Sequence, residues 1–115
     1  MTRIRWYWEG DEFGIIAEGH AEYNPGNDIV CSAISCLLQT FYAGLEMYCY
    51  TPVEHKQESG RFSVKGNAKR YKESVTTLFN SILFGLEMLE REYPENVKIE
   101  RVHGEGGNPF RHSLI

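Results

Sequence analysis

The sequence predicts an α+β fold in which two helices cover one face of a largely antiparallel sheet, in two layers. Short runs of alternating apolar and polar residues lie near both ends and in the middle of the chain, which is typical of strands. Two longer segments carry apolar residues at helical spacing. The expected order is therefore β-β-α-β-β-α-β. At 115 residues, the chain has room for one core only.

The N-terminal segment is expected to form a β-hairpin. Within residues 2–8, Ile4, Trp6 and Trp8 share one face of an alternating run. The alternation resumes from Phe13 to Ala17 after a glycine-bearing turn. Two such runs across a short turn are typical of paired antiparallel strands.

A loop over residues 20–27 leads into the first helix. Asn27 or Asp28 can serve as its N-cap. Apolar residues then recur at helical spacing and form a broad face that we expect to be buried against the sheet. They are Ile29, Val30, Ala33, Ile34, Leu37, Leu38, Phe41, Tyr42 and Leu45.

Two further strands are expected in the middle of the chain, over residues 47–53 and 61–65. They flank a polar turn at residues 57–60. Because Pro52 lacks an N–H group, the first of the two is expected to be an edge strand or a short one.

The second helix is expected to begin near Ala68 and to stop before Pro94, and a last short strand follows within residues 97–102. The predicted domain therefore covers residues 1–102. Residues 103–115 carry too little apolar surface to pack as an element, so we expect a flexible C-terminal tail.

Composition and charge narrow the classes of function. The net charge is −4 and no block of basic residues is present, which argues against direct nucleic-acid binding. No segment approaches the roughly 20 apolar residues of a membrane span. The glycines match no nucleotide-binding pattern, and we expect neither a cofactor nor a metal. Three cysteines without C-x-x-C spacing indicate a reducing, cytoplasmic location.

Cys31 is the candidate nucleophile. With Asp28 as the N-cap it is the third helical residue, where unpaired N–H groups favour a thiolate. It should lie at the border of the buried face, and Ser35 shares that border one turn later. A small cysteine that only packs is the commoner case, and we assign that role to Cys36 and Cys49.

His20 is the candidate partner of this thiol. It follows Gly19 at the end of a strand, where its side chain can be directed across the loop at the next helix. A surface histidine in a turn is the alternative. Asp28 either caps the helix or orients His20, and the sequence leaves both roles open.

The residues Gly19-His20-Ala21 and Asp28-Ile29-Val30-Cys31-Ser32-Ala33, with Ser35 further on, resemble the signature of the ribosomal-processing cysteine proteases, the Prp family. The resemblance implies a His20–Cys31 catalytic dyad under a mobile loop at residues 22–27. It also implies a cytosolic homodimer. The implied substrate is a large-subunit ribosomal-protein precursor, from which the protease removes an N-terminal extension by cutting after an aromatic residue.

Two features depart from the family pattern, namely Pro25 in the loop and the glycine-rich tail. With these departures, a paralogous protease with a phage substrate is an alternative. A non-catalytic binding module associated with ribosomes or phage capsids is a further alternative, and so is a redox-sensing thiol. For the protease we expect N–H groups at the helix start, including that of Cys31, to hold the oxyanion.

Overall fold

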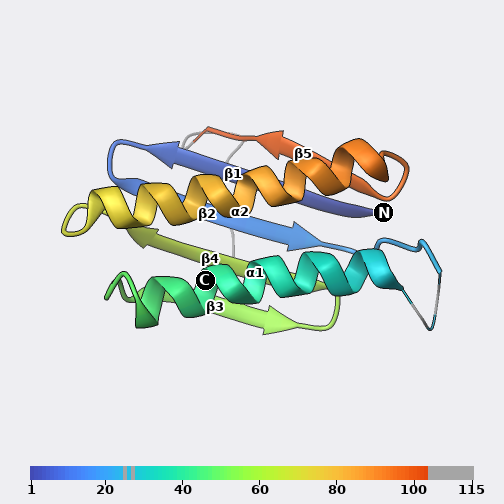
Figure 1. The fold of residues 1–115 in the computed structure, drawn as a ribbon, viewed down its shortest axis with the longest axis horizontal. Coiled ribbons are helices and arrows are strands. Elements are labelled where there is room, and N and C mark those ends of the chain that lie inside the picture. Colours follow the sequence, from blue (N-terminus) through green and yellow to red (C-terminus); the bar gives the residue numbers. More distant parts are fainter. Residues whose placement is uncertain (25, 27, 104–115) are drawn as a thin grey trace.

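The computed structural model describes residues 1–24, 26 and 28–103. The order of its elements is the predicted β-β-α-β-β-α-β (Figure 1). The elements are β1 (Thr2–Glu9), β2 (Glu12–Glu18), α1 (Ile29–Met47), β3 (Val53–Glu58), β4 (Arg61–Asn67), α2 (Lys72–Glu92) and β5 (Val97–Arg101).

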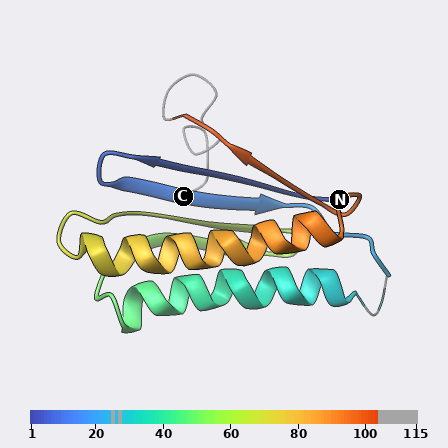
Figure 2. The same cartoon turned by 45° about the horizontal axis from the view of Figure 1, so that its top comes forward.

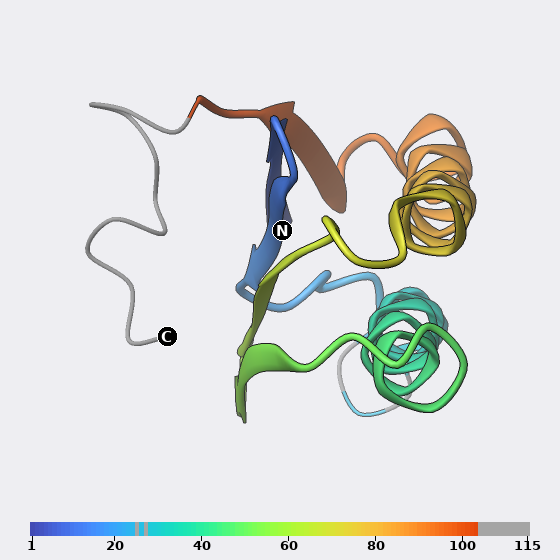
Figure 3. The same cartoon turned by 90° about the vertical axis from the view of Figure 1, so that its left-hand side faces the viewer.

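The five strands form one sheet in the order β3-β4-β2-β1-β5. Three of the neighbouring pairs are antiparallel, and β5 lies parallel to β1 at one edge. Both helices lie on the same side of the sheet, as the view along the sheet shows (Figure 3). The predicted two-layer α+β fold with a largely antiparallel sheet is confirmed.

Aromatic rings hold the two layers together at the centre of the molecule. Phe79 of α2 is buried, and its ring centroid lies 5.8 Å from that of Trp6 and 5.1 Å from that of Trp8. Phe13 of β2 and Phe41 of α1 lie at 6.0 and 5.7 Å from the same ring. Phe79 therefore joins both helices to β1 and β2, mostly through edge-to-face contacts.

The two helices approach each other closely because each carries a glycine opposite a leucine of the other. A methyl group on Gly44 would lie 2.9 Å from the Leu78 side chain, and one on Gly85 would lie 3.1 Å from Leu37. Both leucines thus pack where a larger residue would hold the helices apart.

The predicted strand over residues 47–53 is wrong. α1 continues to Met47, and the next residues turn back onto it, because Tyr48 and Cys49 both donate their N–H groups to the carbonyl of Gly44. β3 starts only after Pro52. It includes the first two residues of the expected turn and is an edge strand of the sheet, as predicted.

Two other expectations about the helices need correction. α2 begins at Lys72 and not at Ala68, because the Ala68 N–H group donates to the carbonyl of Asp11 in the β1–β2 turn. Ile29 is 55% exposed and does not join the buried face of α1. It lies about 100° around the helix from Val30, outside the buried stripe.

The sequence predicted no membrane span, but α1 is long and apolar enough to cross a membrane by length and composition alone. In this structure its apolar face is part of the core, because one stripe of the helix packs against the sheet and α2. The buried residues of α1 are Val30, Ile34, Leu38, Phe41 and Leu45.

Candidate active site

The ends of several helices and strands lie together at one end of the molecule. The start of β1, the end of β2, the start of α1, the end of α2 and the β3–β4 turn all lie at this end (Figures 1 and 2). A pocket of about 410 Å³ opens there between the first turns of α1 and the β3–β4 turn. Ligand pockets commonly have volumes of about 300–1,000 Å³, so this one is large enough to receive a side chain of a bound peptide.

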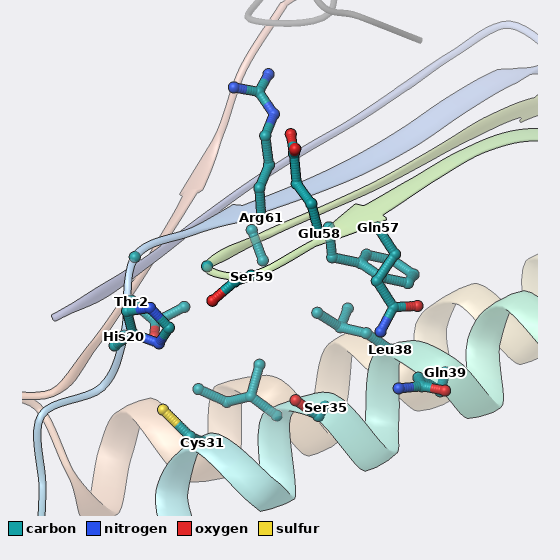
Figure 4. A pocket seen from close by; sticks show the side chains of 15 residues that line it. Thr2, His20, Cys31, Ser35, Leu38, Gln39, Gln57, Glu58, Ser59 and Arg61 are labelled. Atoms are coloured by element: carbon teal, nitrogen blue, oxygen red, sulfur yellow. The ribbon is translucent and has the colours of Figure 1, made fainter. Parts of the chain in front are cut away.

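Cys31 lies in this pocket, in the first turn of α1, and is partly exposed as its position in the sequence predicts. Its sulfur points toward His20 (Figure 4). The N–H group of Ala21 donates a hydrogen bond to Sγ over 3.1 Å. The sulfur is therefore held by the backbone of the residue that follows His20.

His20 is exposed and lines the same pocket, on the side of the β3–β4 turn. Its ring lies against Gly60, where an added methyl group would be 3.0 Å from Nε2. The preceding residue is fixed as well, since the Gly19 N–H group donates to the carbonyl of Gly60 over 2.8 Å. Gly19 has φ +92°, and a side chain on it would meet the carbonyl oxygen of Met1 at 2.5 Å.

Asp28 is the N-cap of α1. Its Oδ1 accepts hydrogen bonds from the N–H groups of Val30 and Cys31, over 3.0 and 2.9 Å, and its Oδ2 accepts one from Tyr23 over 2.9 Å. Desolvation raises the pKa of Asp28, but the backbone hydrogen bonds, led by that of Cys31, lower it below its usual value. Within the described part of the chain, these hydrogen bonds support the capping role of Asp28 and none joins it to His20.

The cap also determines which N–H groups at the start of α1 are already hydrogen-bonded. We expected the N–H group of Cys31 to hold the oxyanion, yet it already donates to Asp28. A backbone donor to the sulfur itself comes from the segment before the helix, namely the N–H group of Ala21. The expectation stays a prediction, and in this structure Asp28 is the partner of this N–H group.

The remaining lining divides into a polar rim and an apolar floor. Ser35 is exposed and lines the pocket one turn after Cys31, as the spacing predicts. Ile34, Leu38 and Phe62 are buried and form an apolar part of the lining. Such a floor fits an apolar side chain of a peptide, with the thiol at its edge.

Sequence reasoning missed two parts of the site. The β3–β4 turn was recognised as a turn but not as a wall of the pocket, because its pairing with the end of β2 is a long-range contact. Asn96, just before β5, was also missed, although its side-chain amide donates to the carbonyl of Ala21 over 2.9 Å. Nothing local in the sequence marks either contact.

The other two cysteines have different surroundings. Cys49 is buried, which raises the pKa of its thiol, and this agrees with a packing role. Cys36 is exposed, so the role of a packed cysteine assigned to it is wrong. It lies on the solvent side of α1, five positions after Cys31, and therefore points away from the core.

Two predictions concern residues that lie partly outside the described chain. Pro25 and Asn27 of the loop expected to be mobile, and residues 104–115 of the tail, are not described. Among the residues that are, no group of three His, Cys, Asp or Glu side chains is arranged to hold a metal ion.

Comparison with known proteins places the chain in a family. The family model described as cysteine protease Prp matches residues 1–98. Two structures of an essential ribosomal processing protease Prp from S. aureus, one with a covalently linked product peptide and one with a substrate peptide, have the same fold. Both are 20% identical to this chain and cover 89% of it with their whole length, at TM-scores of 0.79 and 0.76.

A protein from Streptococcus mutans is 26% identical, with a TM-score of 0.71, over 89% of this chain and 99% of its own. No curated protein matches the sequence. The family model nevertheless covers most of the chain, including His20, Cys31 and Asn96. The chain therefore belongs to the Prp family and is a cysteine protease.

Proposed function

We propose that this chain is an endopeptidase with a His20–Cys31 dyad that removes the N-terminal extension of a large-subunit ribosomal protein. The observation that carries the dyad is the pocket itself, in which a partly exposed thiol points toward an imidazole and receives an N–H hydrogen bond. A thiolate with a neighbouring general acid is the arrangement that thiol proteases need.

The proposed reaction is acyl transfer in two steps. The Cys31 thiolate attacks the scissile carbonyl and forms a carbon–sulfur bond, and protonated His20 gives its proton to the amine as the carbon–nitrogen bond breaks. In the second step, His20 takes a proton from water, and the resulting hydroxide attacks the thioester. The carbon–sulfur bond breaks and Cys31 is again a thiolate, while the carboxylic acid product loses its remaining proton to solvent.

The substrate is inferred from the family and from the pocket. The S. aureus relative is a ribosomal processing protease whose structures contain a substrate peptide and a product peptide. The buried floor formed by Ile34, Leu38 and Phe62 suits the aromatic residue that we expect before the scissile bond. A phage structural protein with the same cleavage sequence is the second candidate substrate.

The test is cleavage of the ribosomal-protein precursor from the same genome, followed by intact mass. We expect the wild-type protein to remove the extension and Cys31→Ala and Cys31→Ser to leave it in place. Cys36→Ser is the matched control, because Cys36 is an exposed cysteine of the same helix, and it should cleave normally.

The outcomes separate the alternatives. Cleavage by Cys31→Ala would show that another residue is the nucleophile. An uncut precursor, with Cys31 alkylated much faster than Cys36, would indicate a live protease with another substrate. An uncut precursor with equal alkylation of both thiols would favour the non-catalytic binding module. A disulfide between Cys31 and another cysteine after peroxide treatment would favour the redox sensor.

We also propose that the protease acts in the cytoplasm as a homodimer. Thiols stay reduced in the cytoplasm, and the three cysteines are free. For the dimer, α2 carries two large exposed apolar side chains one turn apart, Phe84 and Met88, at 59% and 52% exposure. Paired exposed apolar residues of this kind are typical of protein interfaces.

A further inference from the structure

Asn96 connects the last strand of the sheet to the thiol pocket. It lies between α2 and β5, and its backbone is held on both sides. Its N–H group donates to the carbonyl of Tyr93 over 2.9 Å, and its carbonyl accepts from the N–H group of Thr2 over 2.9 Å. The side chain of Asn96 therefore projects from a fixed point between the end of α2 and the start of β1.

That side chain holds Ala21. The Asn96 amide donates from Nδ2 to the carbonyl of Ala21 over 2.9 Å, across 75 positions of sequence. Ala21 is fully buried, and its N–H group donates to Sγ of Cys31. Both polar backbone groups of Ala21 are thus used, one by Asn96 and one by the thiol, and His20 directly precedes it in the chain.

We propose that Asn96 is a positioning residue that acts through Ala21 on the charge of the Cys31 thiolate. This inference rests on the proposed role of Cys31 as the nucleophile. Asn96 fixes the Ala21 backbone so that its N–H group stays within hydrogen-bond distance of the sulfur. Hydrogen bonds to an ionised acceptor are stronger than those between neutral groups, so the contact favours the thiolate over the thiol.

A role in folding alone is the competing explanation, because Asn96 also closes the turn before β5. The two roles affect different parts of the pH profile of alkylation. Loss of the N–H contact makes the thiolate form at higher pH but leaves its reactivity once formed. Loosening of the pocket changes the access of the reagent to the thiolate, and so changes the maximal rate.

The experiment compares the iodoacetamide rate of Cys31 across pH in four proteins, with Cys36 as the reference thiol in the same molecules. Asn96→Leu keeps nearly the same side-chain shape but removes the N–H donor and adds no charge. Asn96→Ala removes the side chain beyond Cβ. Asn80→Leu is the matched control, because Asn80 is an exposed asparagine in the middle of α2. Thermal melts confirm that each protein is folded.

We expect the half-maximal pH for Cys31 to rise by about one unit in both Asn96 variants, equivalent to about 1.4 kcal/mol. The maximal rate should stay within about twofold of wild type, since the free-energy difference lies in forming the thiolate. Asn80→Leu and the Cys36 profile should not change. Folded Asn96 variants with the wild-type half-maximal pH would overturn the proposal.

A measurement on the wild-type protein keeps the proposal testable even if the variants do not fold. The amide proton resonance of Ala21 should shift with pH, with the same midpoint as the Cys31 alkylation rate, because ionisation of the sulfur strengthens that hydrogen bond. An Ala21 resonance that does not shift with pH at this midpoint would overturn the inference. Identical profiles of Cys31 and Cys36 in wild type would instead contradict the proposed function.

Discussion

Asp28 shows how one side chain can fix the start of a helix and, with it, the position of the Cys31 thiol. Its carboxylate takes the N–H groups of Val30 and Cys31 at the helix start and that of Tyr23 in the preceding loop. The helix therefore begins at one defined residue, with the thiol on the pocket side. The cost is that the Cys31 N–H group is occupied before any substrate arrives.

The charge of Asp28 predicts a pH dependence of stability. Its pKa is lowered in the folded protein, so its charge stabilises the fold above the usual value of 3.8, and this contribution is lost as the pH falls through the lowered pKa. Asn caps a helix nearly as well as Asp, so Asp28→Asn isolates the charge. We expect a lower melting temperature than wild type at pH 7 and equal values near pH 2.

Melting curves recorded between pH 2 and 8 check this prediction. A difference in melting temperature that stays constant over that range would mean that the carboxylate contributes through its shape and hydrogen bonds alone.

Residue patterns predicted some of the site and not the rest. The placement of Cys31 at the border of the buried stripe follows from helical periodicity and from the cap at Asp28, and both are local features. The hydrogen bond between Asn96 and Ala21 cannot be predicted from such local features. It depends on the parallel pairing of β5 with β1, which brings together residues that are far apart in the sequence.

The β3–β4 turn offers a test at the scale of an element. Gly60 has φ +73° and contacts His20, whereas Gly10 has φ +61° with nothing near its missing side chain. Both substitutions to alanine carry a similar backbone cost of about 1–2 kcal/mol. Only Gly60→Ala displaces the imidazole, and we expect it to lower kcat/KM by about 10–100-fold.

Gly10→Ala is the matched control and should keep wild-type kcat/KM, although both variants lose stability. The measurement is peptide cleavage at a temperature where both proteins are folded. Equal activity of the two variants would show that the turn does not position His20.

The packing between helix and sheet depends on Phe79, which contacts aromatic rings from β1, β2 and α1. Phe79→Ala leaves a cavity among these rings and should cost about 3–5 kcal/mol of unfolding free energy. Tyr48→Ala removes an aromatic ring that is 80% exposed, and its cost should lie within about 0.5 kcal/mol. Urea unfolding measures both, and similar losses in the two variants would contradict this account of the core.

Elements with strong periodicity were predictable, and the segments between them were not. The apolar spacing of α1 and α2 and the alternation in β1 and β2 predicted these elements and their order. The segment after α1 was misassigned because its aromatic and β-branched residues are typical of strands. In the protein, its N–H groups bond back to carbonyls in the last turns of α1, which extends the helix end where strand preference predicted an extended segment.

Oligomeric state is the prediction that belongs to the whole molecule. If the outer face of α2 forms the dimer, a double Phe84→Glu and Met88→Glu variant should be monomeric, because it places charges in an apolar interface. Tyr48→Glu, at another exposed aromatic side chain, is the control and should remain a dimer. Sedimentation velocity over a range of concentrations measures this, and a dimeric double variant would place the interface elsewhere.

The position of β5 has a consequence for how the protein is made. A chain leaving the ribosome exposes the segments that carry His20 and Cys31 long before residue 97, yet β5 pairs with β1, the first strand of all. A domain generally folds as a unit, so its last strand must be available before the fold is complete. A nascent chain that ends before β5 contains His20 and Cys31 but lacks the strand that pairs with β1. Because β5 is needed to complete the sheet, we expect the thiol pocket to take its final form only after residue 101 has been made.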